Sequence, residues 1–84
     1  MLEVGFHETE AGKLCSVDGL RAVDDLTTCK QAGEALGHQF KRTEDEAGLP
    51  KGCYTGLSKT VYFNQHVHGS ANIFASQICK DTGK

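Results

Sequence analysis

The sequence predicts an α+β domain in which one helix packs on a small antiparallel sheet of about three to five short strands, cross-linked by two disulfides. One segment, residues 25–36, has helical periodicity. Much of the remaining chain consists of short runs rich in β-branched and aromatic residues, separated by turn residues. Four cysteines are spread along 84 residues, a length that allows only a thin core.

Composition indicates a single domain, residues 1–84, that needs a cross-link. Only 38% of the chain is hydrophobic, and tryptophan is absent. A domain of this size hides about 60–65% of the surface of its unfolded chain. The cysteines lie at positions 15, 29, 53 and 79, so they lack the C-x₂₋₄-C pair typical of structural zinc sites. Two disulfides are therefore favoured over zinc or free buried thiols, and they imply a secreted or cell-surface location.

Charge and hydropathy exclude two classes of partner. The formal net charge is −2, and nine Lys and Arg are scattered among eleven Asp and Glu, without the basic stripe that nucleic-acid phosphates require. No apolar run approaches the ~18–20 residues of a membrane span. The opening MLEVGFHETE lacks the apolar region of a signal peptide, so a secreted protein would be represented here by its mature part or an excised domain.

The helix over 25–36 has recognisable ends. Asp24 or Asp25 can cap its first amides, and Thr28-x-x-Gln31 is a candidate capping box. Gly37 is placed to end it in the left-handed conformation. The apolar face is narrow and consists mostly of small residues, which predicts close packing on a sheet: Leu26, Cys29, Ala32, Gly33 and Leu36.

The strands are expected on both sides of this helix. Residues 2–7 are a candidate first strand, and 38–43 a second with Phe40 pointing inward. Pro50 and Gly52 predict a turn. The runs 53–57 and 60–66 predict a hairpin joined near Ser58-Lys59, 67–72 is a loop, and 73–80 is the final strand. Alternation along the second hairpin strand places Val61, Phe63 and Gln65 on one face and Tyr62, Asn64 and His66 on the other.

Four cysteines allow three pairings. Cys29 lies on the apolar face of the helix, and Cys53 opens the strand that the helix should cover. A bond from Cys29 to Cys53 would pin the helix to the sheet, and Cys15 and Cys79 would then join the two ends of the domain. We predict these two pairs.

The order of motifs over residues 12–80 resembles a short four-cysteine domain found in predicted extracellular proteins of algae and other protists. The matching pieces are Cys29 with Ala32, Leu36-Gly37, Pro50-Lys51-Gly52-Cys53-Tyr54, Val61-Tyr62-Phe63-Asn64, Gly69-Ser70-Ala71-Asn72 and Ile78-Cys79-Lys80. The resemblance implies an extracellular module without an established activity. The helix-to-strand bridge is also similar in architecture to PAN/apple domains, which bind proteins or carbohydrates.

The aromatic hairpin is the candidate binding surface. If Cys53 faces the helix, Tyr54 faces away from it, toward solvent or a partner. Tyr54, Tyr62, Asn64 and His66 would then form an aromatic and polar face suited to a sugar ring or a protein. The alternative is that the tyrosines only cover the outer side of the sheet.

Other chemistry has little support in the sequence. His66-x-His68 has a chelating spacing, but no cysteine or acidic residue is adjacent. The acidic run at 44–46 lacks the alternating ligands of an EF-hand, and G-x-S-x-G and H-E-x-x-H are absent. We therefore expect no metal, no cofactor and no catalysis. The expected function is a non-enzymatic recognition module for protein or glycan; the alternative is a self-associating structural subunit of an extracellular assembly or filament.

Overall fold

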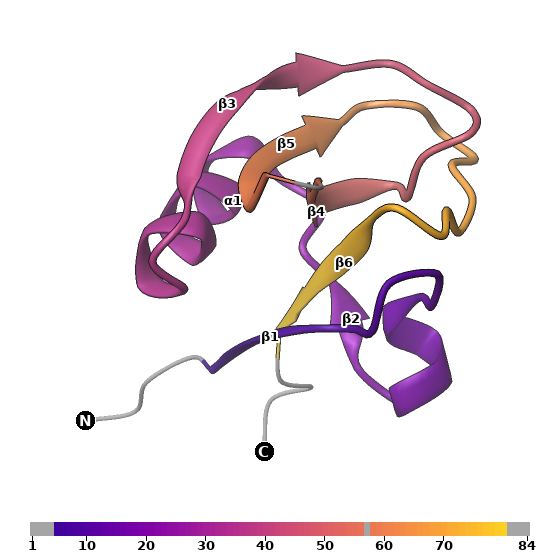
Figure 1. Cartoon of the computed structure of the whole chain (residues 1–84), viewed down its shortest axis with the longest axis horizontal. Coiled ribbons are helices and arrows are strands. Elements are labelled where there is room, and N and C mark those ends of the chain that lie inside the picture. Colours follow the sequence, from indigo (N-terminus) through magenta and orange to yellow (C-terminus); the bar gives the residue numbers. More distant parts are fainter. Residues whose placement is uncertain (1–4, 57, 81–84) are drawn as a thin grey trace.

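The computed structural model describes residues 5–56 and 58–80 and consists of one α-helix on a six-stranded sheet (Figure 1). In chain order the elements are β1 (Phe6–Glu8), a 3₁₀ helix η1 (Cys15–Asp18), β2 (Arg21–Ala22), α1 (Leu26–Ala35), β3 (Gln39–Glu44), β4 (Gly52–Thr55), β5 (Thr60–Asn64) and β6 (Ser76–Lys80). The α+β fold class is confirmed. Of the expected first strand, residues 2–4 lie outside the described part, and η1 and β2 were not predicted.

The sheet is mixed and larger than expected. Its strand order is β1-β6-β4-β5-β3, and β2 also pairs with β6. The β3–β5 pair is parallel, whereas the other pairs are antiparallel. The parallel pair arises because β5 lies between β3 and β4 in the sheet. Because β3 and β4 run in opposite directions, the strand between them must be parallel to one of them.

Both ends of α1 are set by local sequence. The Asp25 carboxylate accepts a hydrogen bond of 2.9 Å from the Thr28 amide, so Asp25 is the N-cap. The predicted capping box is wrong, because Thr28 occupies the third helical position instead of the cap. Gly37 has φ of +79°, and the amides of Gly37 and His38 donate to the carbonyls of Glu34 and Gly33. This is the Schellman end that the glycine predicted.

The helix packs closely on β3, β4 and β5. A Cβ at Gly33 would lie 3.1 Å from Val61 Cγ2, so this helical position has room only for glycine unless Val61 shifts. Cys29 and Ala32 are also buried, which confirms the predicted stripe of small residues. Leu26 is an exception to the prediction, because it lies at the first position of α1 and is exposed.

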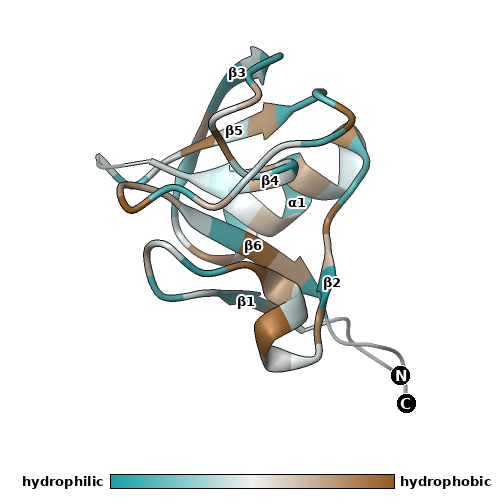
Figure 2. Ribbon diagram, turned by 90° about the vertical axis from the view of Figure 1, so that its right-hand side faces the viewer, coloured by the Kyte–Doolittle hydropathy of each residue, from teal (hydrophilic) through white to brown (hydrophobic). Residues whose placement is uncertain are grey.

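One hydrophobic core joins the helix to the sheet. Phe40 packs against it, which confirms its predicted inward direction, and Phe63 packs there as well. In Figure 2 the middle of β6 is hydrophobic and its ends are hydrophilic, which matches a strand whose centre crosses this core. The core residues are Val23, Cys29, Ala32, Cys53, Val61 and Ile78.

The hairpin is confirmed, and the last strand is shorter than predicted. Tyr54 pairs with Tyr62 across β4 and β5. The strand β6 begins at Ser76, because a turn precedes it in which the Ala75 amide donates to the Asn72 carbonyl. Ile73 and Phe74 therefore lie outside the sheet and are exposed.

Candidate functional site

Both predicted disulfides are present. Cys29 and Cys53 join α1 to β4 with Cα atoms 5.3 Å apart, and Cys15 and Cys79 join η1 to β6 with Cα atoms 5.7 Å apart. All four cysteines are buried, and no free thiol remains. The chemistry of a thiolate nucleophile is therefore not available to this chain while both bonds are intact.

The predicted aromatic and polar face, which we call the tyrosine face, is largely buried within the protein. Its members are Tyr54, Tyr62, Asn64 and His66. Tyr54 and Tyr62 stack with ring centroids 5.3 Å apart, and the Arg42 guanidinium lies 5.3 Å from the Tyr62 ring. The expectation that Tyr54 faces solvent or a partner is wrong, because only 3% of this residue is exposed. Its hydroxyl donates to Glu44, which also pairs with Arg42. Burial and this hydrogen bond raise the pKa of Tyr54 above its ordinary value, so the phenol stays protonated.

Asn64 is a structural residue of the adjacent loop. It is 1% exposed, and its Oδ1 accepts from the amides of Glu46 and His66 at 2.9 and 3.2 Å. Its Nδ2 donates to the carbonyls of Glu46, Leu49 and Pro50 at 2.8–3.1 Å. The predicted exposed position of Asn64 is therefore wrong, since both polar atoms of its side chain are already bound within the protein.

The ring of His66 accepts hydrogen bonds from the backbone of the loop that follows it. Its Nδ1 accepts from the amides of His68 and Gly69 at 3.1 and 3.3 Å, and its ring centroid lies 6.2 Å from that of His68. Among residues 5–56 and 58–80, no three His, Cys, Asp or Glu side chains lie close enough together to hold a metal ion. Of the predicted face, Tyr62 and His66 are the two members that are partly exposed.

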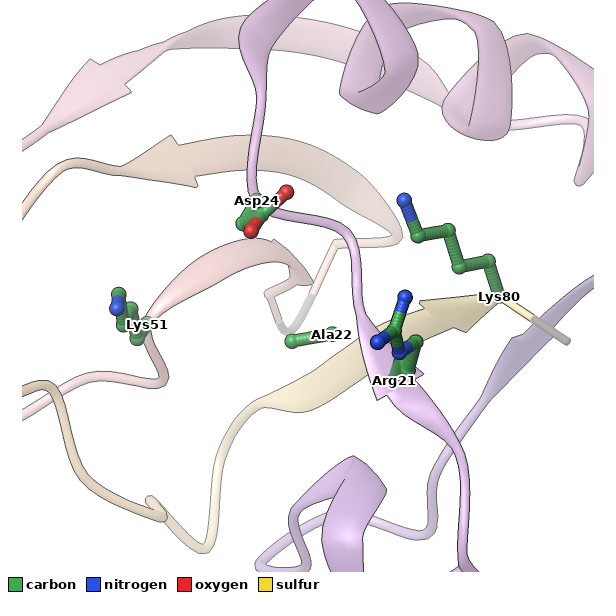
Figure 3. A pocket seen from close by; sticks show the side chains of 5 residues that line it. All are labelled: Arg21, Ala22, Asp24, Lys51 and Lys80. Carbon is green, nitrogen blue, oxygen red and sulfur yellow. The ribbon is translucent and has the colours of Figure 1, made fainter. Parts of the chain in front are cut away.

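Two open hollows lie on a different surface. A first hollow of about 350 Å³ is lined by Arg21, Ala22, Asp24, Lys51 and Lys80 (Figure 3). A second, of about 260 Å³, is lined by Asp24, Lys51, Gly52, Phe63, Asn64 and Gln65. Because the two hollows share Asp24 and Lys51, they adjoin, and we call them together the basic groove.

The backbone brings this groove together from distant segments. Arg21 and Lys80 are directly opposite each other in the β2–β6 pair. The Val23 amide donates to Ile78 and the Val23 carbonyl accepts from Cys53, which holds the segment between β2 and α1 beside the sheet. Gly52 is required here, because its φ is +80° and a Cβ would lie 2.4 Å from the Val23 carbonyl oxygen.

Lys51 is positioned by two neighbours. Its carbonyl accepts a 2.7 Å hydrogen bond from Nε2 of Gln77, whose side chain is buried. The preceding loop is tied to residues 70–72, since Ser70 Oγ donates to the Ala47 carbonyl and Asn72 Nδ2 to the Gly48 carbonyl. The motif Gly69-Ser70-Ala71-Asn72 therefore holds the loop that precedes Lys51.

The side chains of the groove cations make no direct polar contact with another described residue. Within the described residues, no hydrogen bond or salt bridge uses the side-chain nitrogens of Arg21, Lys51 or Lys80. Figure 3 shows Arg21 and Lys80 extending from neighbouring strands, with Asp24 between them and Lys51. The hydrogen bonds from Thr28 lower the pKa of the nearby Asp25, and the charge of Lys80 adds to this effect.

Sequence reasoning missed this groove. Its charged residues are spread from position 21 to position 80, and Arg21 lies on a strand of two residues, which is too short to show periodicity. Lys51 and Lys80 each lie close to a disulfide cysteine, so the predicted bonds could have indicated that these two lysines are held rigidly. No sequence signal indicates that the two lysines line the same hollow.

The fold and the groove define a small α+β domain with two disulfides and a charged groove beside its helix. No protein-family model matches the chain, and no curated protein or solved structure is significantly similar to it. The resemblance to the four-cysteine domain of algae and protists stays a prediction. No helix within the described residues is long and apolar enough to cross a membrane.

Proposed function

We propose that the domain is a non-enzymatic extracellular recognition module whose ligand, a glycan or a protein, binds in the basic groove. One observation carries the proposal: three cations from separate segments line one hollow, and their side chains form no hydrogen bond or salt bridge with a described residue. Like charges placed opposite each other across strands destabilise a sheet. An arrangement that costs stability in the free protein is expected where a ligand neutralises it.

The disulfides support the extracellular part of the proposal. Both bonds are fully buried and use every cysteine of the chain. Bonds of this kind form and persist in oxidising compartments, and small secreted domains depend on them because their cores are thin.

The charge pair at Arg21 and Lys80 gives a stability prediction. We expect Arg21→Thr to raise the free energy of unfolding by about 0.2–1 kcal/mol, because it removes a like-charge cross-strand contact and introduces a β-branched residue. Urea denaturation measures this change. As a control, Arg42→Thr removes a stacked and ion-paired arginine and should lower stability. A loss of stability with Arg21→Thr would show that this arginine serves the fold.

The location of binding is tested by nuclear magnetic resonance. The ¹⁵N-labelled domain is titrated with size-defined oligosaccharides, neutral and acidic, and with acidic peptides. We expect shift changes of the backbone amides to concentrate at residues 21–24, 51–53, 63–65 and 80. Changes confined to Tyr62, Arg42 and the rest of the tyrosine face would contradict the proposed site, and no change with any of these probes would contradict the recognition role.

A structural role is the second candidate, and one observation favours it. Val67, Ile73 and Phe74 are 69%, 73% and 59% exposed within a single connection between β5 and β6. Exposed apolar side chains of this size are typical of surfaces that associate. If the domain assembles through them, sedimentation velocity shows concentration-dependent mass, which Ile73→Ser with Phe74→Ser abolishes. A monomer at all concentrations excludes this role.

A further inference from the structure

We infer that the ligand of the basic groove is an acidic polysaccharide, with its sulfate or carboxylate groups bound by Arg21 and Lys80 and by Lys51, and a sugar ring against Phe63 and Gln65. This inference rests on the proposed function and names the ligand class for the same groove.

The first hollow has the chemistry of an anion site. It holds three cations and one carboxylate, that of Asp24, although the chain as a whole has a net charge of −2. The positive charge is therefore local. The guanidinium fork of Arg21 matches the paired oxygens of a carboxylate or sulfate, Lys80 supplies a point charge beside it, and Lys51 supplies one across the hollow.

The start of α1 does not compete for this anion. The Asp25 carboxylate already accepts the Thr28 amide at 2.9 Å and occupies the N-terminal end of the helix. An incoming acidic group is consequently bound by side chains, which makes its affinity sensitive to single substitutions of those side chains.

The second hollow offers an aromatic surface and an amide. Phe63 lines it, with its ring partly buried against the core and so held in place. The Gln65 amide nitrogen of the backbone donates to the Glu44 carbonyl at 2.7 Å, which fixes the backbone below an exposed side chain. Since the Asn64 amide is used within the protein, Gln65 is the one of the two amide side chains in this wall that is able to bond a hydroxyl. Binding sites for small polar ligands combine aromatic surface with a few such groups.

The same groove is poorly suited to an acidic peptide. Peptides usually add a strand to a free sheet edge or place an amphipathic helix in an apolar groove. The edge strands β1 and β3 line neither hollow, and β2, which pairs only with β6 and lines the first hollow, has two residues and so offers little edge for strand addition. Phe63 is the one large apolar side chain in the walls of the two hollows, so an amphipathic helix would find little to bury against.

The test compares four polymers by isothermal titration calorimetry: oligosaccharides of dextran sulfate, oligogalacturonate, uncharged dextran and poly-glutamate. We expect one or both acidic sugars to bind at least about tenfold more tightly than dextran and poly-glutamate. Sulfated and carboxylated probes distinguish the two sources of the acidic group. Raising NaCl from about 0.05 M to about 0.5 M should weaken binding to the acidic sugars, because salt screens the exposed cations.

Matched variants distinguish a specific anion site in the groove from general electrostatic attraction between the ligand and the protein. The triple variant Arg21→Gln, Lys51→Gln, Lys80→Gln should lose at least about tenfold in affinity, since charge-assisted contacts are removed. The control, Lys30→Gln, Lys41→Gln, Lys59→Gln, changes the net charge equally at exposed positions outside the groove and should stay within about twofold. Thermal denaturation of both variants confirms that they fold.

The outcomes distinguish this inference from the proposed function. Equal losses in both triple variants would overturn the anion site. Binding to dextran as tight as to the acidic sugars, lost in Gln65→Ala, would overturn the acidic ligand while keeping a recognition role. Tightest binding to poly-glutamate would overturn the polysaccharide. Absence of binding to all four polymers would overturn the acidic polysaccharide, and if the titrations with acidic peptides also leave the groove amides unshifted, the proposed function fails with it.

Discussion

Replacing both Cys29 and Cys53 by alanine is expected to unfold the domain at about 37 °C. The bond between them spans 24 residues and pins α1 to β4. Restraining the unfolded chain by a loop of this length contributes about 3.5 kcal/mol. Both cysteines are also completely buried within the core cluster, so the truncation leaves voids inside that core. For a small domain with a stability of about 5–10 kcal/mol, the losses from loop entropy and from core packing together approach the whole free energy of unfolding.

The matched control is Cys15→Ala with Cys79→Ala. This bond spans 64 residues, so unfolded-state entropy alone assigns it the larger effect, about 4 kcal/mol. Neither of these cysteines belongs to the main core cluster. Circular dichroism on heating should therefore show the greater loss for the Cys29–Cys53 pair. The reverse order would mean that loop entropy outweighs core packing, and an unchanged melting temperature in the first variant would contradict the argument.

The parts of the fold that could be predicted rest on short-range signals or on a single covalent constraint. Asp25 and Gly37 set the ends of α1 by hydrogen bonds to residues no more than four positions away. The hairpin follows from alternation over few residues. The pairing of Cys29 with Cys53 follows because each cysteine lies on the face of its element that turns toward the other. In each case the cause lies within one or two adjacent elements.

The burial of Tyr54 could not be predicted from such short-range signals. The alternation of side chains along β4 correctly places Tyr54 and Cys53 on opposite faces of the strand. It does not tell whether other parts of the chain cover the face on which Tyr54 lies. The strand β4 lies between β5 and β6, and all four of its residues are buried. Only the full strand order reveals that Tyr54 is central, and that order depends on pairings between residues far apart in the chain.

The basic groove could not be predicted from the sequence, because it also depends on pairings between residues far apart in the chain. It forms where β2, the start of β4 and the end of β6 meet. The strand β2 has two residues and exists because the chain between η1 and α1 crosses beside β6. Scattered charges in the sequence therefore become a local excess of positive charge only after long-range pairing.

Asn64→Asp is expected to destabilise the domain by about 3–4 kcal/mol at pH 7. The substitution keeps size and the acceptor oxygen that binds the amides of Glu46 and His66. It replaces the donating nitrogen by a second oxygen that would face the carbonyls of Glu46, Leu49 and Pro50. Burial beside three carbonyl oxygens raises the pKa of the introduced carboxyl, because the charged form has lost its solvent and its donors.

The sign of the pH dependence follows from that raised pKa. The protonated carboxyl can donate to one carbonyl, so the variant is least destabilised below the ordinary carboxyl pKa of about 3.9 and loses stability as pH rises through the raised value. Urea denaturation of the variant and the parent at several pH values measures the difference. Asn72→Asp is the control, since its side chain donates one hydrogen bond, to the Gly48 carbonyl, and should cost less than about 1 kcal/mol. If Asn64 instead served a ligand, Asn64→Asp would leave stability unchanged at every pH and alter binding alone.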